Sequence, residues 1–293
     1  MIDFSCADFT FPLLDRKQSL ALLHMLGFTH VDIGLFARSK TYSPSALCAS
    51  PAAYTRAVRE DLERENLRPA DVFLQIGADP PEASANDPSP SVRAQNRDVF
   101  RAAVDFAAAL QCPHFTGLPG VYHDRIARPA DWELAVEEAA WRKALCSSAG
   151  IRYAVEAHLG SICEDIDSTL RFVTDVPGLT LTLDYGHFIF QGVPSEQVHA
   201  LARHASHFHA RAGARGRLQT PLTENEIEFK GALAALRDAE FSGAIAFEYV
   251  WIDWNQCNRC DNISETILLR ELFATLLLNS PAPSIAPELR ASR

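Results

Sequence analysis

The fold of this chain is decided by four segments of its second half: YAVEAH (153–158), LTLTLDYGHF (179–188), HFHARAG (207–213) and AIAFEYV (244–250). Each contains a mostly apolar run that ends at an ionisable side chain, and these side chains are Glu156, Asp184, His209 and Glu248. Such runs are typical of buried parallel strands, so each side chain is expected where a strand meets its loop. The spacings of 28, 25 and 39 residues leave room for a helix between consecutive strands.

The same alternation of strand-like and helix-like segments occurs about eight times along the chain. The predicted strands are Ile2–Cys6, His30–Leu35, Val72–Ile76, His114–Thr116, Arg152–Glu156, Leu179–Asp184, His207–Ala210 and Ile245–Tyr249. Amphipathic stretches rich in alanine and leucine lie between them. Regular alternation predicts a parallel sheet, and eight units favour closure into a barrel over an open sheet. We therefore predict the α/β class and a (β/α)8 TIM barrel.

The predicted barrel covers residues 1–279 as one catalytic domain, and Ser280–Arg293, with its prolines, is expected to be a C-terminal tail. Asp79–Ser91 is rich in proline, serine and aspartate and is predicted to be a loop after the third strand. No linker divides the chain. Its 293 residues fit a barrel of this class, which commonly has about 250 residues.

Composition excludes several classes of protein. The net charge of −10 disfavours a nucleic-acid partner, because such proteins usually present a basic surface. The N-terminus lacks the positive start of a signal peptide, and no apolar stretch is long enough to cross a bilayer. Seven cysteines without a secreted framework indicate reduced thiols and a cytoplasmic protein. One CxxC pair, Cys257 and Cys260, is a weak zinc signal.

The four side chains at the strand ends form a candidate metal site. They follow predicted strands five to eight, which are neighbours in a barrel, and active sites lie at the carboxyl ends of its strands. Crowded carboxylates repel one another unless a cation lies between them. Oxygen donors with one imidazole suit Mn²⁺, which we expect, and also Mg²⁺, Co²⁺, Fe²⁺ or Zn²⁺. Alone, each would more often be a loop acid, a helix cap or a structural histidine; their joint placement favours the metal site.

These motifs resemble those of the xylose isomerase-like barrel superfamily, in particular its sugar isomerase and epimerase branch. The branch includes ketose 3-epimerases, hydroxypyruvate isomerases and inosose dehydratases. The matching motifs are the Glu of VEAH, the Asp and His of LDYGH, the His of HFHAR and the Glu of FEYV. The resemblance implies one divalent metal on Glu156, Asp184, His209 and Glu248. It also implies that Glu156 and Glu248 act as acid and base, and that His187 contacts a substrate oxygen.

The chemistry agrees with this resemblance. A metal chelated by a carbonyl and a neighbouring hydroxyl acidifies the carbon-bound proton between them and stabilises the resulting enediolate. Two carboxylates can then exchange protons at that carbon. We therefore expect a divalent-metal-dependent isomerase or epimerase of a small keto-sugar or sugar derivative. The alternatives are a metal-dependent dehydratase of a keto-inositol-like substrate and a non-catalytic sugar-binding barrel. The endonuclease branch is disfavoured, since residues 74–76 and 118–120 lack its extra histidines.

Further residues near the predicted mouth are candidates for substrate binding. Arg215 and Arg217 follow the metal histidine, and arginine binds carboxylates, phosphates and paired hydroxyls well. His158 lies two residues beyond Glu156, on the same side of an extended strand. Trp251 and Trp254 follow Glu248 and could line the pocket and pack on a sugar ring. A solvated loop or a core position is the alternative in each case.

Arg211 occupies a position at which many relatives have an acidic residue, so the subfamily and any second metal site stay open. Barrels of this family often associate, and the sequence leaves the oligomeric state undecided.

Overall fold

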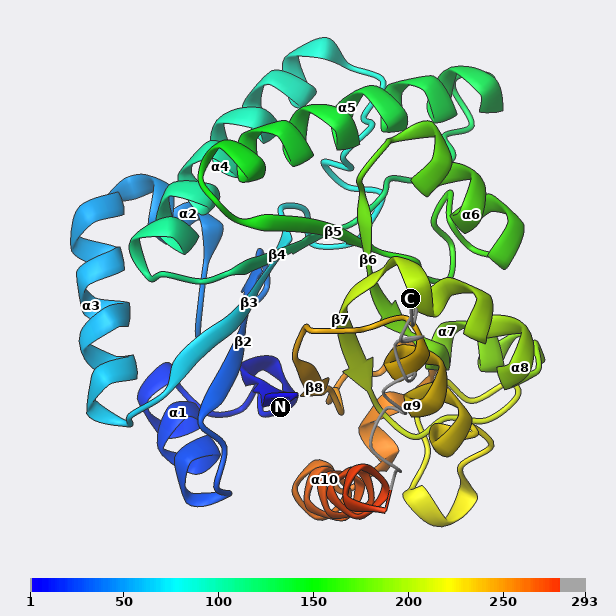
Figure 1. Ribbon diagram of the computed structural model, residues 1–293. Helices are drawn as coiled ribbons and strands as arrows, with labels where there is room; N and C mark the ends of the chain where they lie inside the picture. Colours follow the sequence, from blue (N-terminus) through cyan, green and yellow to red (C-terminus); the bar gives the residue numbers. More distant parts are fainter. Residues whose placement is uncertain (1, 280–293) are drawn as a thin grey trace, which may run out of the picture.

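The computed structural model describes residues 2–279 and shows a closed barrel of eight parallel strands surrounded by helices (Figure 1). The strands are β1 Phe4–Ala7, β2 His30–Phe36, β3 Arg68–Gln75, β4 His114–Gly117, β5 Arg152–Glu156, β6 Thr180–Asp184, β7 Ala205–Ala210 and β8 Ile245–Phe247. They pair in sequence order, and β8 closes the ring on β1. The predicted fold class is confirmed. The expected tail, 280–293, lies outside the described residues.

The helices form the outer layer of the barrel (Figure 1). They are α1 Arg16–Met25, α2 Pro44–Ala49, α3 Pro51–Arg64, α4 Pro90–Ala109, α5 Arg128–Ser148, α6 Ile166–Asp175, α7 Tyr185–Phe190, α8 Ser195–Val198, α9 Phe229–Asp238 and α10 Asn262–Leu278. Short 3-10 turns cover η1 Asp8–Thr10, η2 His199–His204, η3 Leu222–Glu224 and η4 Trp254–Arg259. Among residues 2–279, no helix is long and apolar enough to cross a membrane.

Helix starts follow local sequence chemistry. Asp15 and Asp165 each accept a hydrogen bond from the backbone N–H three residues on, and the side chains of Gln18 and Ser168 return the contact. These capping boxes satisfy N–H groups that the first helical turn leaves free. Four other helices have proline at their start, where its fixed φ fits and its missing N–H costs nothing.

Closure of the barrel brings the ends of β5 to β8 to one mouth, while the register between neighbouring strands is staggered. Asp184 pairs with His209 across β6 and β7, and Glu156 pairs with Thr182 across β5 and β6. The sequence analysis extended β8 to Tyr249, but the strand ends at Phe247, so Glu248 begins the following loop. The backbone there still hydrogen-bonds to β7, because the N–H of Glu248 donates to the carbonyl of Ala210. The ends of these four strands therefore face one another at the carboxyl mouth of the barrel.

Candidate metal centre

The four predicted ligands all lie buried at the carboxyl mouth of the barrel. Glu156 ends β5, Asp184 ends β6, His209 lies near the end of β7, and Glu248 directly follows β8. Each is at most 5% exposed. Burial of three carboxylates at one level is costly unless positive charge or hydrogen-bond donors compensate it. The contacts of each carboxylate therefore show which positive charges and donors compensate its burial and which are missing.

His209 lies between the two glutamates. Its Nδ1 is 2.7 Å from Oε1 of Glu156 and 2.9 Å from Oε2 of Glu248. The hydrogen bond goes to Glu156, and Oε2 of Glu248 is buried with no hydrogen-bond partner among the described residues. Donor atoms of these three residues all lie within 4.8 Å of one another. An orphaned, buried carboxylate oxygen beside a second carboxylate and an imidazole fits a bound cation.

Asp184 has different partners from the two glutamates. Its Oδ1 accepts the backbone N–H of Gly186 at 2.7 Å, so it caps α7, and its Oδ2 accepts a hydrogen bond from the guanidinium of Arg211. Nη2 of Arg211 also lies 3.0 Å from Nε2 of His187. Donor atoms of Asp184, Glu156 and His187 also lie within 4.8 Å of one another. Asp184 therefore does cap a helix, which was the alternative to a metal ligand. The cap uses only Oδ1, and Oδ2 remains among the side chains of the mouth.

The pKa directions follow from burial and from these contacts. Burial, opposed by the hydrogen bond from His209 and reinforced by the charge of Glu248, raises the pKa of Glu156 to about 7. For Glu248, burial is outweighed by the charges of His209 and Arg211, and the pKa lies below its ordinary value. Burial is outweighed at His209 too, where Glu248 holds the pKa well above its usual range. A proton on His209 therefore provides positive charge between the two glutamates.

His187 differs from His209 in its charge. Burial and the neighbouring Arg211 both lower its pKa far below the ordinary range, so the ring is neutral. Arginine can only donate, so Nε2 of His187 accepts the hydrogen bond from Arg211. Burial lowers the pKa of both histidines, and the charge of the nearest side chain makes the two directions opposite. His209 faces carboxylates, whereas His187 faces a guanidinium.

The other predicted substrate residues differ in burial and in their contacts with the mouth. His158 is buried, its Nδ1 donates to the carbonyl of Leu159, and its ring packs edge-on against His187 with ring centres 6.0 Å apart. Its Nε2 has no hydrogen-bond partner in the described part of the chain. Trp251 is 43% exposed. Arg217 forms an exposed ion pair with Glu224, and the side chain of Arg215 is exposed as well, so neither arginine contacts the metal cluster.

Sequence reasoning missed one feature of the mouth. It noted Arg211 as a departure but did not place it on Asp184. The sequence HFHAR contained a signal for Arg211, since residues 207, 209 and 211 point to one side of an extended strand. Of the two tryptophans expected near the mouth, Trp254 has its ring 6.3 Å from that of His187.

The residues at the mouth fit one divalent cation. Glu156, His209 and Glu248 offer two oxygens and one nitrogen that lie within 4.8 Å of one another. Asp184 adds a further oxygen next to Glu156. Oxygen-rich sets with one imidazole suit Mn²⁺, Mg²⁺, Co²⁺, Fe²⁺ or Zn²⁺, and the donor set does not select one of them.

Comparisons with known proteins agree with this architecture. The family model described as xylose isomerase-like TIM barrel matches residues 20–270. D-allulose 3-epimerase from Methylomonas sp. is 18% identical, with a TM-score of 0.73 over 94% of this chain and 98% of that one. No curated protein sequence matches.

Two further solved structures are similar. A xylose isomerase-like TIM barrel protein from Mycobacterium smegmatis, solved in complex with magnesium, is 15% identical over 89% of this chain and 87% of that one, with a TM-score of 0.70. The probable 3-DHS dehydratase AsbF from Bacillus anthracis is 14% identical over 93% and 99%, with a TM-score of 0.66. At these identities the likeness shows the fold alone.

Proposed function

The chain belongs to the xylose isomerase-like TIM barrel family, and from this premise we propose that it is a divalent-metal-dependent sugar isomerase or epimerase. Its substrate would be a small keto-sugar or sugar derivative. The observation that carries the proposal is the buried group of Glu156, His209 and Glu248, in which a carboxylate oxygen of Glu248 has no hydrogen-bond partner among residues 2–279. Membership of the family supports this class of reaction, and the buried group supports a bound metal.

Glu156, Asp184, His209 and Glu248 would hold the metal, which when bound supplies Lewis-acid polarisation of a substrate carbonyl. Glu156 and Glu248 have a second role as proton carriers. They approach one imidazole nitrogen from β5 and β8, so two carboxylates border a single small volume. A carboxylate with one oxygen free can remove a proton from the carbon beside the carbonyl, and the second can return it.

Arg211 and His187 would orient the substrate. Arg211 is 3% exposed and His187 is 4% exposed, and both contact the mouth cluster through Asp184 or its neighbours. A neutral imidazole can either donate to a carbonyl oxygen or accept from a hydroxyl. Trp254 beside His187 provides an apolar ring face, which suits packing against the carbon side of a sugar.

A dehydratase is the second candidate, because its first step is the same removal of a proton next to a carbonyl. It differs only in the loss of a β-hydroxyl from the resulting anion. The solved structures similar to this chain include both an epimerase and a probable dehydratase, so the fold accommodates both outcomes. The identity of the product separates them.

The test is a screen of keto-sugars and keto-inositols with metal-loaded protein in D₂O. Exchange of solvent deuterium into one carbon, followed by NMR and mass spectrometry, identifies both the substrate and the reacting position. Deuterium in an isomer of equal composition supports the isomerase or epimerase. Deuterated product that has lost water supports the dehydratase. Sugars that bind but show neither exchange nor elimination would contradict the proposal and favour a non-catalytic sugar-binding barrel.

A further inference from the structure

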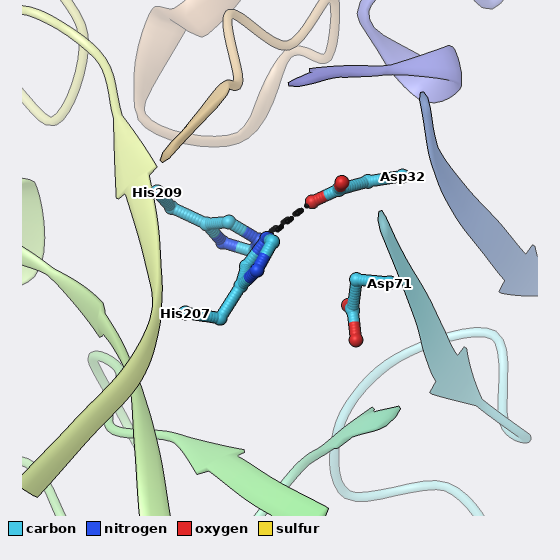
Figure 2. A group of neighbouring side chains, drawn as sticks. All are labelled: Asp32, Asp71, His207 and His209. Atoms are coloured by element: carbon cyan, nitrogen blue, oxygen red, sulfur yellow. Dashed lines mark hydrogen bonds and ion pairs between the residues drawn. The ribbon is translucent and has the colours of Figure 1, made fainter. Parts of the chain in front are cut away.

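A second group of buried ligand-type side chains lies inside the barrel, below the mouth. Asp32 on β2, Asp71 on β3 and His207 on β7 extend from different strands into the lumen, and His209 approaches them from above (Figure 2). Donor atoms of these four residues lie within 4.8 Å of one another. Asp32 and Asp71 are fully buried and the two histidines are 1% exposed. We call this group the lumen cluster.

One oxygen of each lumen carboxylate is held by an outer partner. The hydroxyl of Ser5 donates to Oδ1 of Asp32 at 2.6 Å, and Nδ1 of His114 lies 2.7 Å from Oδ1 of Asp71. His114 is fixed in turn through its Nε2, 2.8 Å from Oγ of Ser206. Partners of this kind orient metal-binding carboxylates in proteins, and here they leave Oδ2 of each aspartate directed at the other members of the lumen cluster.

The second oxygens and a ring nitrogen face the same space. Oδ2 of Asp32 is 2.6 Å from Nε2 of His207 and 3.7 Å from Nε2 of His209. Oδ2 of Asp71 and Nε2 of His209 are buried, and neither finds a hydrogen-bond partner within residues 2–279. A buried polar atom without a partner is costly, so two in one cluster call for a ligand that satisfies both.

A cavity of about 730 Å³ opens at the amino-terminal end of the barrel, next to the lumen cluster. It is lined in part by Arg68, His114, Ser206 and His207, which lie at or near the starts of β3, β4 and β7. His207 is the member of the lumen cluster that lines this cavity, and it is 1% exposed. The cavity therefore approaches the cluster from the side opposite the candidate metal centre.

We propose that Asp32, Asp71 and His207 form a second divalent-cation site in the lumen, with Nε2 of His209 as its fourth donor. Two carboxylate oxygens and two imidazole nitrogens form a set that suits tetrahedral Zn²⁺. His209 then lies between two sites, since its Nδ1 faces the glutamates of the mouth and its Nε2 faces the lumen. The site shares only His209 with the metal of the proposed function. With both ions bound, the ring would bridge them as an imidazolate and release both of its ring protons to solvent. The test of the lumen site uses no activity measurement.

The experiment locates Zn²⁺ in crystals of the full chain. Protein treated with chelator is loaded with Zn²⁺, and anomalous scattering is measured at the zinc edge. The expected result is a peak between Asp32 and Asp71, with the peak absent in Asp71→Asn. Asp131→Asn is the matched control, because Asp131 is also fully buried and paired with a histidine, His123 at 2.6 Å, outside the lumen. This control should keep the lumen peak.

Metal counting on folded protein in solution makes the same distinction, whether or not the mouth is occupied. Asp71→Asn should bind one Zn²⁺ fewer per chain than wild type and than Asp131→Asn, with folding checked by circular dichroism. No lumen peak in the wild-type crystals would overturn the proposal and leave Asp32–His207 and Asp71–His114 as dry ion pairs. Equal zinc counts for wild type and folded Asp71→Asn would overturn it as well.

Discussion

The mouth and the lumen of this barrel bury carboxylates in two different ways. At the mouth, three carboxylates share one imidazole and one guanidinium, and an oxygen of Glu248 is left without a hydrogen-bond partner in the described residues. In the lumen, Asp32 and Asp71 each have a histidine of their own. One strand, β7, contributes a histidine to each region: His207 to the lumen and His209 to the mouth. One strand can therefore carry a layer in which each carboxylate has a histidine of its own and, two residues later, a layer in which three carboxylates share one imidazole and one guanidinium.

The largest expected effect is on metal binding at the mouth. Asp184→Ala should lower metal affinity there by more than the roughly 10–100-fold typical of a lost outer partner. The measurement is calorimetric titration of chelator-treated protein with Mn²⁺. Asp165→Ala is the matched control, because Asp165 also caps a helix, α6, but is exposed and outside the cluster. Unchanged mouth affinity in Asp184→Ala would remove Asp184 from the ligand set.

The next effect concerns Arg211, the buried cationic side chain of the mouth. Arg211→Met removes the guanidinium that pairs with Asp184 and leaves that carboxylate buried without its charge partner. Breaking a buried pair in this way costs about 3–5 kcal/mol of unfolding free energy. Denaturant unfolding of the metal-free protein measures it. A loss below about 1 kcal/mol would mean that Asp184 does not depend on Arg211.

The mouth should also make stability depend on pH. Burial raises the pKa of Glu156 from 4.5 to about 7, so the folded state binds a proton that the unfolded state has released. The stabilisation is present below pH 4.5 and is lost as pH rises through about 7. Metal-free wild type should therefore lose stability over this window. Thermal unfolding measures the slope, and Glu156→Gln should make it shallower; an equal slope would assign the dependence elsewhere.

The smallest expected effect is at the exposed end of the same loop. Arg217 pairs with Glu224, both about half exposed, and such surface pairs contribute about 0–1 kcal/mol. Arg217→Ala should therefore leave unfolding free energy nearly unchanged, in contrast to Arg211→Met. Its proposed role in substrate binding predicts a higher KM with unchanged metal affinity. Equal KM values for Arg217→Ala and wild type would confine the arginine to the surface ion pair.

Much of the fold could be predicted because local patterns and barrel geometry agree. The apolar runs that end at Glu156 and Asp184 predict the last residues of β5 and β6 correctly, and the alternation with helices predicts the parallel ring. The end of β8 was placed too late, since Tyr249 continues the apolar pattern after pairing has stopped. Strand ends depend on what the neighbouring strand offers, which the sequence of one strand does not contain.

The contacts of the site were less predictable than its members. That Arg211 reaches Asp184 depends on the twist and register of β6 and β7, including an irregularity between Leu181 and Thr182. The lumen cluster was missed because a lone Asp32 in the apolar run VDIGLF does not indicate whether it faces the lumen or the helices. Only its pairing with His207, 175 residues away, shows that it faces the lumen.

The most direct test of the central claim is solvent deuterium exchange by the Glu156→Gln, Glu248→Gln double variant, loaded with metal and compared with wild type on the substrate found by the screen. Glutamine keeps shape and a metal-binding oxygen but cannot accept the proton. Because acid and base groups typically contribute about 10²–10⁴-fold to the rate, the rate of exchange should fall by at least about 10²-fold. Near-wild-type exchange by the metal-loaded double variant would contradict the account and transfer the proton chemistry to His187.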